Sequence, residues 1–186
     1  YGDVTVEDAL AVSSDTFFYK IGEEIFAQRG GQPILQDEVR KFGFGSRTGI
    51  DLPFETAGRV PDKVSKKKLV EDGALMAGES TDYLVGDNVQ LAVGQGLLAA
   101  SPLQLAQAYG ALANGGDVNR PLVGRALLQP GTPNSDIVGY ADMSQAVVES
   151  FLANKDTIRS LNMPDEIRLP IIRGLTRVIT GPGVTF

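Results

Sequence analysis

The chain has 186 residues, of which 42% are apolar, so it is long and apolar enough for one globular domain with a sizeable core. Its formal net charge of -6 argues against nucleic-acid binding, which requires a basic face. The sequence contains no Cys and no His, which excludes thiol chemistry, a disulfide framework and a Ser-His-Asp hydrolase. We therefore expect no metal and no cofactor. No apolar run approaches the roughly 20 residues that span a bilayer.

Three helices are predicted in the first part of the chain. Residues 5–12 form a short helix that Thr5 caps, with Asp8 at a position that suits a carboxylate. A second helix begins at Ser14 or Asp15 and ends before a pair of glycines. Its apolar residues follow helical spacing and are Phe17, Phe18, Ile21, Ile25 and Phe26. Residues 34–42 form the third helix, with an apolar and a charged side.

The middle of the chain is predicted to consist largely of loops. Residues 42–53, FGFGSRTGIDLP, are rich in glycine and form turns, with a short extended piece at 49–52. Residues 54–82 are interpreted mainly as loop, and the three lysines at 66–68 as a solvated run within it.

Helices resume after residue 100. Ser101 and Pro102 are a helix cap and a first helical residue, and Asn114 with two glycines ends that helix. The residues that it is predicted to bury are Leu103, Leu105, Ala106, Tyr109, Leu112 and Ala113. A strand, a turn and two helices are expected to follow, at 121–128, 130–134, 142–154 and 169–180. The predicted fold class is predominantly α with short β elements.

Residues 94–99, GQGLLA, fit the GxGxxA fingerprint of dinucleotide-binding folds. In those folds the helix opens within the glycine turn, whereas Ser101 and Pro102 start it later here. No βαβ unit that ends in an acidic residue follows. We interpret the segment as a tight turn that leads into a helix, and nucleotide binding ranks far behind the other hypotheses.

Ser65 and Lys68 match the string SxxK, which in serine acyl-transferases places a nucleophile and its lysine one helical turn apart. Here the string lies in a charged segment with little apolar packing. A lysine in such a segment is solvated and protonated, and is therefore a poor base. We interpret the match as a coincidence.

Ser13-Ser14-Asp15 lies at the junction between the first two predicted helices. A Ser or Asp before an apolar helical run is commonly an N-cap, which is the plain structural interpretation. A helix–loop–helix junction can also expose side chains to a cleft. Since a cap and a catalytic role are compatible, both stay open for these residues.

Three stretches of the sequence resemble the class B penicillin-binding proteins, and within them the elongation-type D,D-transpeptidases that build the lateral cell wall. They are ALAVSSDTFFYKIG, RKFGFGSRTGIDLP and GDNVQLAVGQGLLAASPLQLAQAYGALANGG. FGFGxxTGIDLP followed by VGQGxxxxSPLQLA is a specific combination. The tail GLTRVITGPGVTF is similar to the helix and turn just before that family's third motif. The likeness covers almost the whole chain.

That family uses three motifs, SxxK, SxN and KTG. Ser13-Ser14-Asp15 matches SxN with Asp in place of Asn, a variant that the elongation-type branch often shows, whereas RTG at 47–49 belongs to the GFGxxTGIDLP segment. The resemblance implies that residues 1–186 are a partial transpeptidase domain, from the SxN-type motif to just before the KTG strand, without most of the central sheet. The nucleophile would precede Ser13 in a longer parent protein. We expect the chain alone to be inactive and to expose apolar surface.

The resemblance also implies a mechanism. A Ser outside this chain would attack the D-Ala-D-Ala carbonyl, helped by a Lys one turn later, and an amine would then take the acyl group. Ser13 would relay a proton between that Lys and the leaving or attacking amine. Asp15, when ionised, only accepts hydrogen bonds, and it would hold the cationic Lys or a substrate N–H. Ser14 is expected to cap the helix, and the rings of Phe17 and Phe18 to anchor it.

The partners that the resemblance implies are peptidoglycan stem peptides, β-lactams and, through the parent, membrane-embedded cell-wall synthesis proteins, with no nucleic acid. The implied location is the extracytoplasmic face of the bacterial cell membrane, where an N-terminal transmembrane helix would anchor the parent. The alternative is a non-catalytic module of the same fold that binds peptidoglycan or a wall-synthesis partner. SxxK upstream and KTG downstream in the parent would favour the enzyme.

Overall fold

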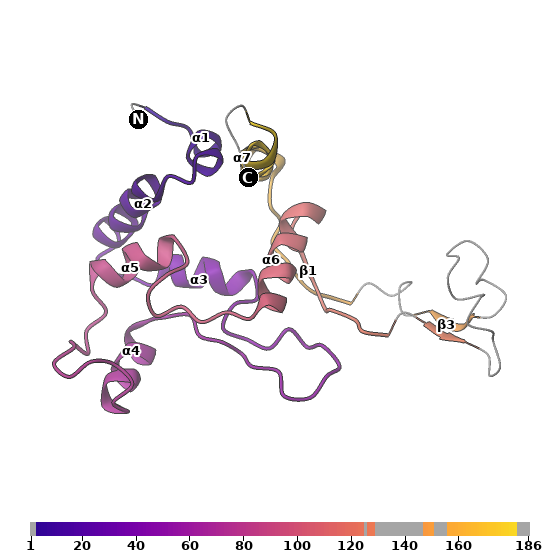
Figure 1. The fold of residues 1–186 in the computed structure, drawn as a ribbon, viewed down its shortest axis with the longest axis horizontal. Coiled ribbons are helices and arrows are strands. Elements are labelled where there is room, and N and C mark those ends of the chain that lie inside the picture. The colour runs from indigo at the N-terminus through magenta and orange to yellow at the C-terminus, as the bar shows by residue number, and fades with distance from the viewer. Residues whose placement is uncertain (1–2, 125, 129–146, 151–155, 182–186) are drawn as a thin grey trace.

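The computed structural model describes residues 3–124, 126–128, 147–150 and 156–181, and this part of the chain is mainly helical (Figure 1). Its helices are α1 (Val6–Ala11), α2 (Asp15–Gln28), α3 (Ile34–Lys41), α4 (Lys63–Glu71), α5 (Val85–Ala92), α6 (Pro102–Asn114) and α7 (Asp165–Thr180). Its strands are β1 (Asp117–Asn119), β2 (Ala126–Leu128), β3 (Val147–Ser150) and β4 (Thr157–Ser160). β1 pairs with β4 and β2 with β3, each pair antiparallel. The predicted fold class is confirmed.

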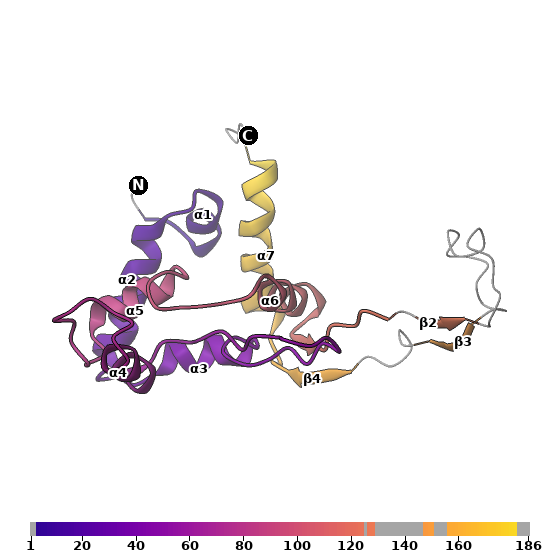
Figure 2. The same cartoon turned by 60° about the horizontal axis from the view of Figure 1, so that its bottom comes forward.

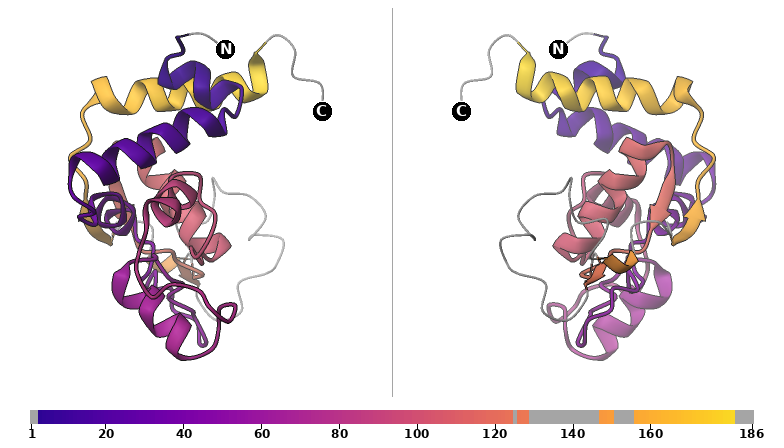
Figure 3. Two further views of the ribbon diagram at one scale, coloured as in Figure 1. Left: turned by 90° about the vertical axis from the view of Figure 1, so that its left-hand side faces the viewer. Right: turned by 90° about the vertical axis from the view of Figure 1, so that its right-hand side faces the viewer.

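Two helix pairs organise the first part of the fold. α2 packs chiefly against α5, and α1 packs against α7, which is close in space although far away in sequence. Figure 3 shows α7 running beside α1, with α2 in the next layer. The β2–β3 ribbon projects away from the helices (Figures 1 and 2).

Capping residues explain where several helices begin and end. The hydroxyl of Thr5 accepts the N–H of Asp8 at 3.2 Å, and the Asp8 carboxylate accepts the N–H of Thr5 at 3.3 Å. Ser101 and Gln104 form the same reciprocal cap at the start of α6. α6 ends at Gly115, whose φ of +97° lies in the left-handed region that glycine adopts readily. These predicted helix ends are confirmed.

The predicted loop at 54–82 contains helix α4, so that prediction is wrong in part. Asp62 caps α4, because its carboxylate accepts the N–H of Ser65 at 2.8 Å. The three lysines lie in α4 and not in a loop, and the interpretation of the run as solvated is wrong for Lys66, which is only 4% exposed, whereas Lys67 and Lys68 are exposed. The Lys66 ammonium donates to both carboxylate oxygens of Asp87, at 3.0 and 2.7 Å. Pairing with α5 therefore buries one lysine of an otherwise largely exposed helix.

The buried face of α6 differs from the predicted one. The residues that α6 buries are Gln104, Gln107, Ala108 and Ala111. Those predicted to be buried but in fact exposed are Leu105, Ala106, Tyr109 and Ala113. The side-chain amides of Gln104 and Gln107 donate to backbone carbonyls of the loop after α3 and of β1, at 2.7–2.8 Å. Polar contacts therefore decide which face of α6 turns inward.

The strands are the elements that the sequence predicts least well. β1 follows α6 in a segment with no predicted strand, and of the strand predicted at 121–128 only β2 forms among the described residues. β3 lies inside the segment 142–154, which is predicted to be helical; the rest of that segment, and the predicted turn at 130–134, lie outside the described residues. Short apolar runs do not distinguish a strand from a buried helix, which explains the error at β3. The extended piece at 49–52 forms no strand.

Candidate active site

Ser13-Ser14-Asp15 forms the junction between α1 and α2, as predicted. Ser13 has a φ of +51°, in the left-handed region that residues other than glycine rarely occupy. Its N–H donates to the carbonyl of Leu10 at 3.2 Å, and the N–H of Ser14 donates to the carbonyl of Ala9 at 2.8 Å. Because Ala9 is fully buried, these bonds tie the junction to the core.

The side chains of the motif lie at the surface. Ser13 and Asp15 are exposed, and Asp15 stands in the first turn of α2, where the helix dipole favours a carboxylate. Ser14 occupies the N-cap position, but its hydroxyl lies 3.3 Å from the hydroxyl of Thr16 and makes no cap bond. The prediction that Ser14 is the N-cap of this helix is therefore confirmed for its position, although its side chain makes no cap bond.

Two aromatic rings support the start of α2. The rings of Phe17 and Phe18 meet edge to face, with centroids 5.2 Å apart and planes at 82°. Both side chains are half-buried, so they anchor the helix less deeply than full core positions would. Complete burial of such a ring contributes about 1.5–3 kcal/mol, and partial burial contributes less.

Ion pairs hold α1 against α7. Arg173 donates through Nε to the Glu7 carboxylate at 2.8 Å, and Arg177 donates through Nη1 to Asp8 at 2.8 Å. Hydrogen bonds from the Thr5 hydroxyl and from Arg177 lower the pKa of Asp8 to about 2. The carboxylates of α1 therefore stay ionised over a wide pH range, and they fix the helix that leads into Ser13.

Buried amides hold α2 against α5 and α3. The Asn88 side chain donates to the carbonyl of Gly22 at 2.8 Å, and Gln36 donates to the Asn88 side-chain oxygen at 3.0 Å. Gln36 and Asn88 are each 2% exposed. Within the described part of the chain, Gln36 Oε1 and the Tyr83 hydroxyl are buried without a hydrogen-bond partner, and burial raises the pKa of Tyr83 to about 12. Sequence reasoning misses this network, because amides give no periodic signal.

The other two candidate motifs have structural roles. The Ser65 hydroxyl donates to the carbonyl of Asp62 at 3.1 Å and accepts the N–H of the same residue, so the cap engages it in both directions. Lys68 is exposed, as predicted. The element before GQGLLA is helix α5 and not a strand, which removes the context of a dinucleotide site.

Polar side chains clamp the glycine-rich loop between α3 and α4. Gln104 Nε2 donates to the carbonyls of Ser46 and Ala57, at 2.7 and 2.8 Å. Glu55 accepts both the N–H and the hydroxyl of Thr48, each at 2.6 Å. Burial raises the pKa of Glu55, but the hydrogen bonds from Thr48 and Gly49 and the charge of Arg47 together outweigh it and hold that pKa below its usual value. The segment FGFGSRTGIDLP is therefore a structural loop held by buried acceptors and donors.

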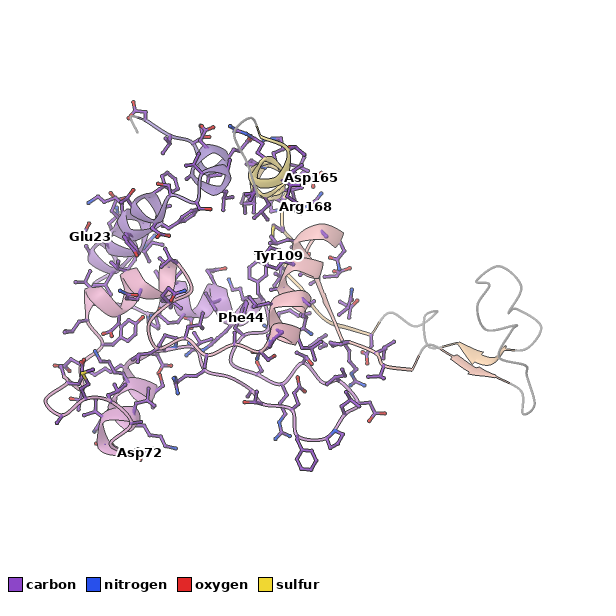
Figure 4. The ribbon with its side chains drawn as sticks, viewed as in Figure 1. Glu23, Phe44, Asp72, Tyr109, Asp165 and Arg168 are labelled. Carbon is purple, nitrogen blue, oxygen red and sulfur yellow. The ribbon has the colours of Figure 1, made fainter. Side chains whose placement is uncertain are left out.

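Several cavities lie among the helices. They measure about 240 Å³ between α6 and β1, 290 Å³ between α3 and α4, 390 Å³ between α3 and α7, and 320 Å³ between α1, α6 and α7. The last is lined mainly by apolar side chains that include Phe44 and Tyr109, which lie near each other in Figure 4. Neither Ser13 nor Asp15 lines any of these four. The described residues hold no group of three or more acidic side chains placed to bind a metal.

The helical fold and the clamped glycine-rich loop after α3 are the features with which this domain is compared with known protein families. The comparison with known families identifies it directly: the model of the penicillin binding protein transpeptidase domain matches residues 1–159. The chain belongs to this family. No helix among the described residues is both long and apolar enough to cross a bilayer.

The chain is also similar to individual members of the family. It is 31% identical over 159 residues to the peptidoglycan D,D-transpeptidase MrdA of Haemophilus influenzae, an alignment that covers 83% of this chain and 22% of that protein. Its fold matches the penicillin-binding protein PBP2 of Helicobacter pylori in complex with MreC, with a TM-score of 0.63, 25% identity, and coverage of 98% and 26% of the two chains. It also matches PBP2 of Pseudomonas aeruginosa in complex with WCK 5153, with a TM-score of 0.66, 25% identity, and coverage of 98% and 34%. The chain thus spans about a fifth of the length of the curated relative that it matches.

Proposed function

We propose that this chain is part of a peptidoglycan D,D-transpeptidase, which cross-links stem peptides through a serine acyl-enzyme and binds penicillin. The match of the transpeptidase-domain model over residues 1–159 carries the proposal. The similarity to MrdA, named as a D,D-transpeptidase, supports it. Residues 1–186 form the part of the domain between the SxN-type motif and the KTG strand, and the longer protein supplies the nucleophile.

The catalytic residues of this part in the proposal are Ser13 and Asp15, and Ser13 is the proton relay. Its hydroxyl both donates and accepts hydrogen bonds, so it can pass a proton between the catalytic lysine and the amine that leaves or attacks. Its place at the helix junction and its match to the first residue of the SxN motif support this role. Asp15, when ionised, accepts hydrogen bonds only, so it holds the lysine ammonium or a substrate N–H and favours the charged lysine.

The proposed partners are stem peptides and β-lactams at the site, and cell-wall synthesis proteins elsewhere on the parent. The solved complex of a similar PBP2 with MreC supports a partner of that kind. The proposed location is the extracytoplasmic face of the bacterial membrane, with the parent anchored by an N-terminal transmembrane helix.

A non-catalytic module that binds peptidoglycan or a wall-synthesis partner is the second candidate. It is favoured by one observation, that neither Ser13 nor Asp15 lines any of the four cavities described above. Labelling with a fluorescent penicillin separates the two functions. The longer protein should label covalently and the 186-residue chain should not, whereas a longer protein that stays unlabelled would support the binding module. Labelling of the short chain at Ser65 would contradict the assignment of that serine to a cap.

The role of Ser13 is tested by Ser13→Ala in the longer protein. Loss of a proton relay is expected to slow acylation by penicillin roughly 10²- to 10⁴-fold. Ser14→Ala is the matched control, because it removes the neighbouring hydroxyl, which bonds only locally with Thr16. A near-normal acylation rate of Ser13→Ala would contradict the catalytic role and leave Ser13 with a structural role only.

A further inference from the structure

The two helices that meet at Ser13 each approach a neighbouring helix at a buried glycine. α1 meets α7 at Gly174, and α2 meets α5 at Gly22. Neither glycine has a positive φ. Glycine is therefore needed at these two positions because it has no side chain, and not because its backbone can adopt unusual conformations.

At Gly174 there is no room for a side chain. A Cβ there would lie 2.9 Å from the Cβ and 3.0 Å from the Cδ1 of Leu10, and 3.1 Å from the Cα of Glu7. Carbon atoms attract best at about 3.5–4.0 Å, so α1 would have to move away by several tenths of an ångström. Leu10 is also the residue whose carbonyl accepts the N–H of Ser13, at 3.2 Å. A displaced α1 therefore carries Ser13 with it.

At Gly22 the contact is equally close. A Cβ there would lie 2.9 Å from the Cβ of Ala92, 3.1 Å from the carbonyl oxygen of Asn88 and 3.2 Å from the Cα of Val89. The Asn88 side chain donates to the carbonyl of Gly22 at 2.8 Å and so fixes the spacing of α2 and α5. Because α2 starts at Asp15, the last residue of the motif, a displaced α2 moves the other side of the junction.

We propose that Gly174 and Gly22 are positioning residues, which hold the Ser13 hydroxyl in place by letting α7 and α5 approach closely. The inference rests on the proposed function, in which Ser13 transfers a proton. Proton transfer requires heavy atoms about 2.6–3.2 Å apart. Since a misplacement of about 1 Å costs roughly 10²-fold in rate, a shift of several tenths of an ångström is expected to cost roughly tenfold.

Gly174→Ala and Gly22→Ala in the longer protein test the proposal. The measurements are the first-order acylation rate at saturating fluorescent penicillin, the half-saturating concentration and the melting temperature. The matched control is Gly110→Ala in α6, where no atom lies within 4 Å of an added Cβ. All three variants replace a helical glycine by alanine, which by itself favours the helix. We expect the acylation rate to fall roughly tenfold in the first two and less than about twofold in the control.

The double variant Gly22→Ala/Ala92→Gly separates position from stability. It removes the Ala92 Cβ, the nearest of the three atoms that the new side chain meets, so the acylation rate should recover part of its loss even where the melting temperature does not. If Gly22→Ala yields too little folded protein, Ala92→Ser adds one atom at the same contact and is the milder variant.

Rates of both glycine variants within twofold of Gly110→Ala, or a loss that the double variant fails to recover, would overturn the positioning role. Ser13→Ala distinguishes the two levels of the hypothesis. If Ser13→Ala acylates slowly while the glycine variants do not, only the positioning role fails. If Ser13→Ala acylates normally, the proposed catalytic role of Ser13 fails first.

Discussion

A buried ion pair holds helix α4 on α5, and replacing its lysine gives a sharp stability prediction. In Lys66→Ala the Asp87 carboxylate, whose side chain is 16% exposed, keeps the N–H of Leu84 at 2.7 Å but loses the ammonium. Removing one partner of a buried pair costs about 3–5 kcal/mol, because a charge is left in a poorly solvated place. Since Asp87 retains some exposure, we expect about 3 kcal/mol. For a chain of this size that corresponds to a fall of about 6–12 °C in melting temperature.

Circular dichroism during heating measures this change, with Lys67→Ala as the matched control. Lys67 is the next residue of the same helix, but its pair with Glu71 spans 3.7 Å and both side chains are more than half exposed. Such a pair contributes about 0.3–0.5 kcal/mol, so the control should melt within about 2 °C of the unchanged protein. Lys66→Met/Asp87→Asn removes both charges and should recover more than half of the loss. Equal melting temperatures of Lys66→Ala and Lys67→Ala would refute the idea that burial makes this pair important.

Three further predictions concern stability and association. Gln104→Ala leaves the part-buried carbonyls of Ser46 and Ala57 without their donor and should cost about 1–3 kcal/mol in urea unfolding, whereas exposed Gln90→Ala should be near neutral. The pKa of Asp8 is lowered to about 2 in the folded chain, so its stabilising effect is complete above pH 4 and fades as the pH falls towards 2. The difference in melting temperature between the unchanged protein and Asp8→Asn should therefore shrink between pH 4 and pH 2. Tyr109 and Leu105 are 56% and 46% exposed beside an apolar cavity, so we expect the 186-residue chain to self-associate. Leu105→Glu should weaken this self-association in sedimentation experiments. A monodisperse monomer of the unchanged chain would contradict the prediction.

Local signals in the sequence were sufficient wherever a helix end is decided by its own residues. The caps at Thr5 and Ser101 and the glycine stop at Gly115 depend on hydrogen bonds between residues at most four apart, and all three ends agree with prediction. The junction at Ser13-Ser14-Asp15 was found in the same way, from a cap signal between two periodic segments. The left-handed backbone conformation of Ser13 could not be predicted, because serine has no preference for that conformation.

Contacts between distant residues explain the failures. Lys66 is buried because Asp87, 21 residues further on, receives its ammonium, so no local pattern of α4 predicts it. The inward face of α6 is set by carbonyls of another loop, which Gln104 reaches across 58 residues to Ser46. A hydrophobic pattern places leucine and tyrosine inside by default, and it cannot anticipate an amide that satisfies backbone groups. Tertiary hydrogen bonds therefore overrode the apolar stripe.

The segments that identify the family, FGFGxxTGIDLP and SPLQLA, do not contain the residues proposed for its chemistry, Ser13 and Asp15. The hydrogen-bond needs of the glycine-rich loop explain this separation. A glycine-rich loop packed between helices has few partners of its own for its backbone groups, and each buried group left unpaired costs about 1–3 kcal/mol. Gln104 and Glu55 meet that need at Ser46, Ala57 and Thr48, so they fix the path of the loop backbone. An exposed hydroxyl at a helix junction places no comparable restriction on its surroundings. The pattern FGFGxxTGIDLP with SPLQLA is accordingly specific for a fold, and the function of Ser13 has to be established by kinetics.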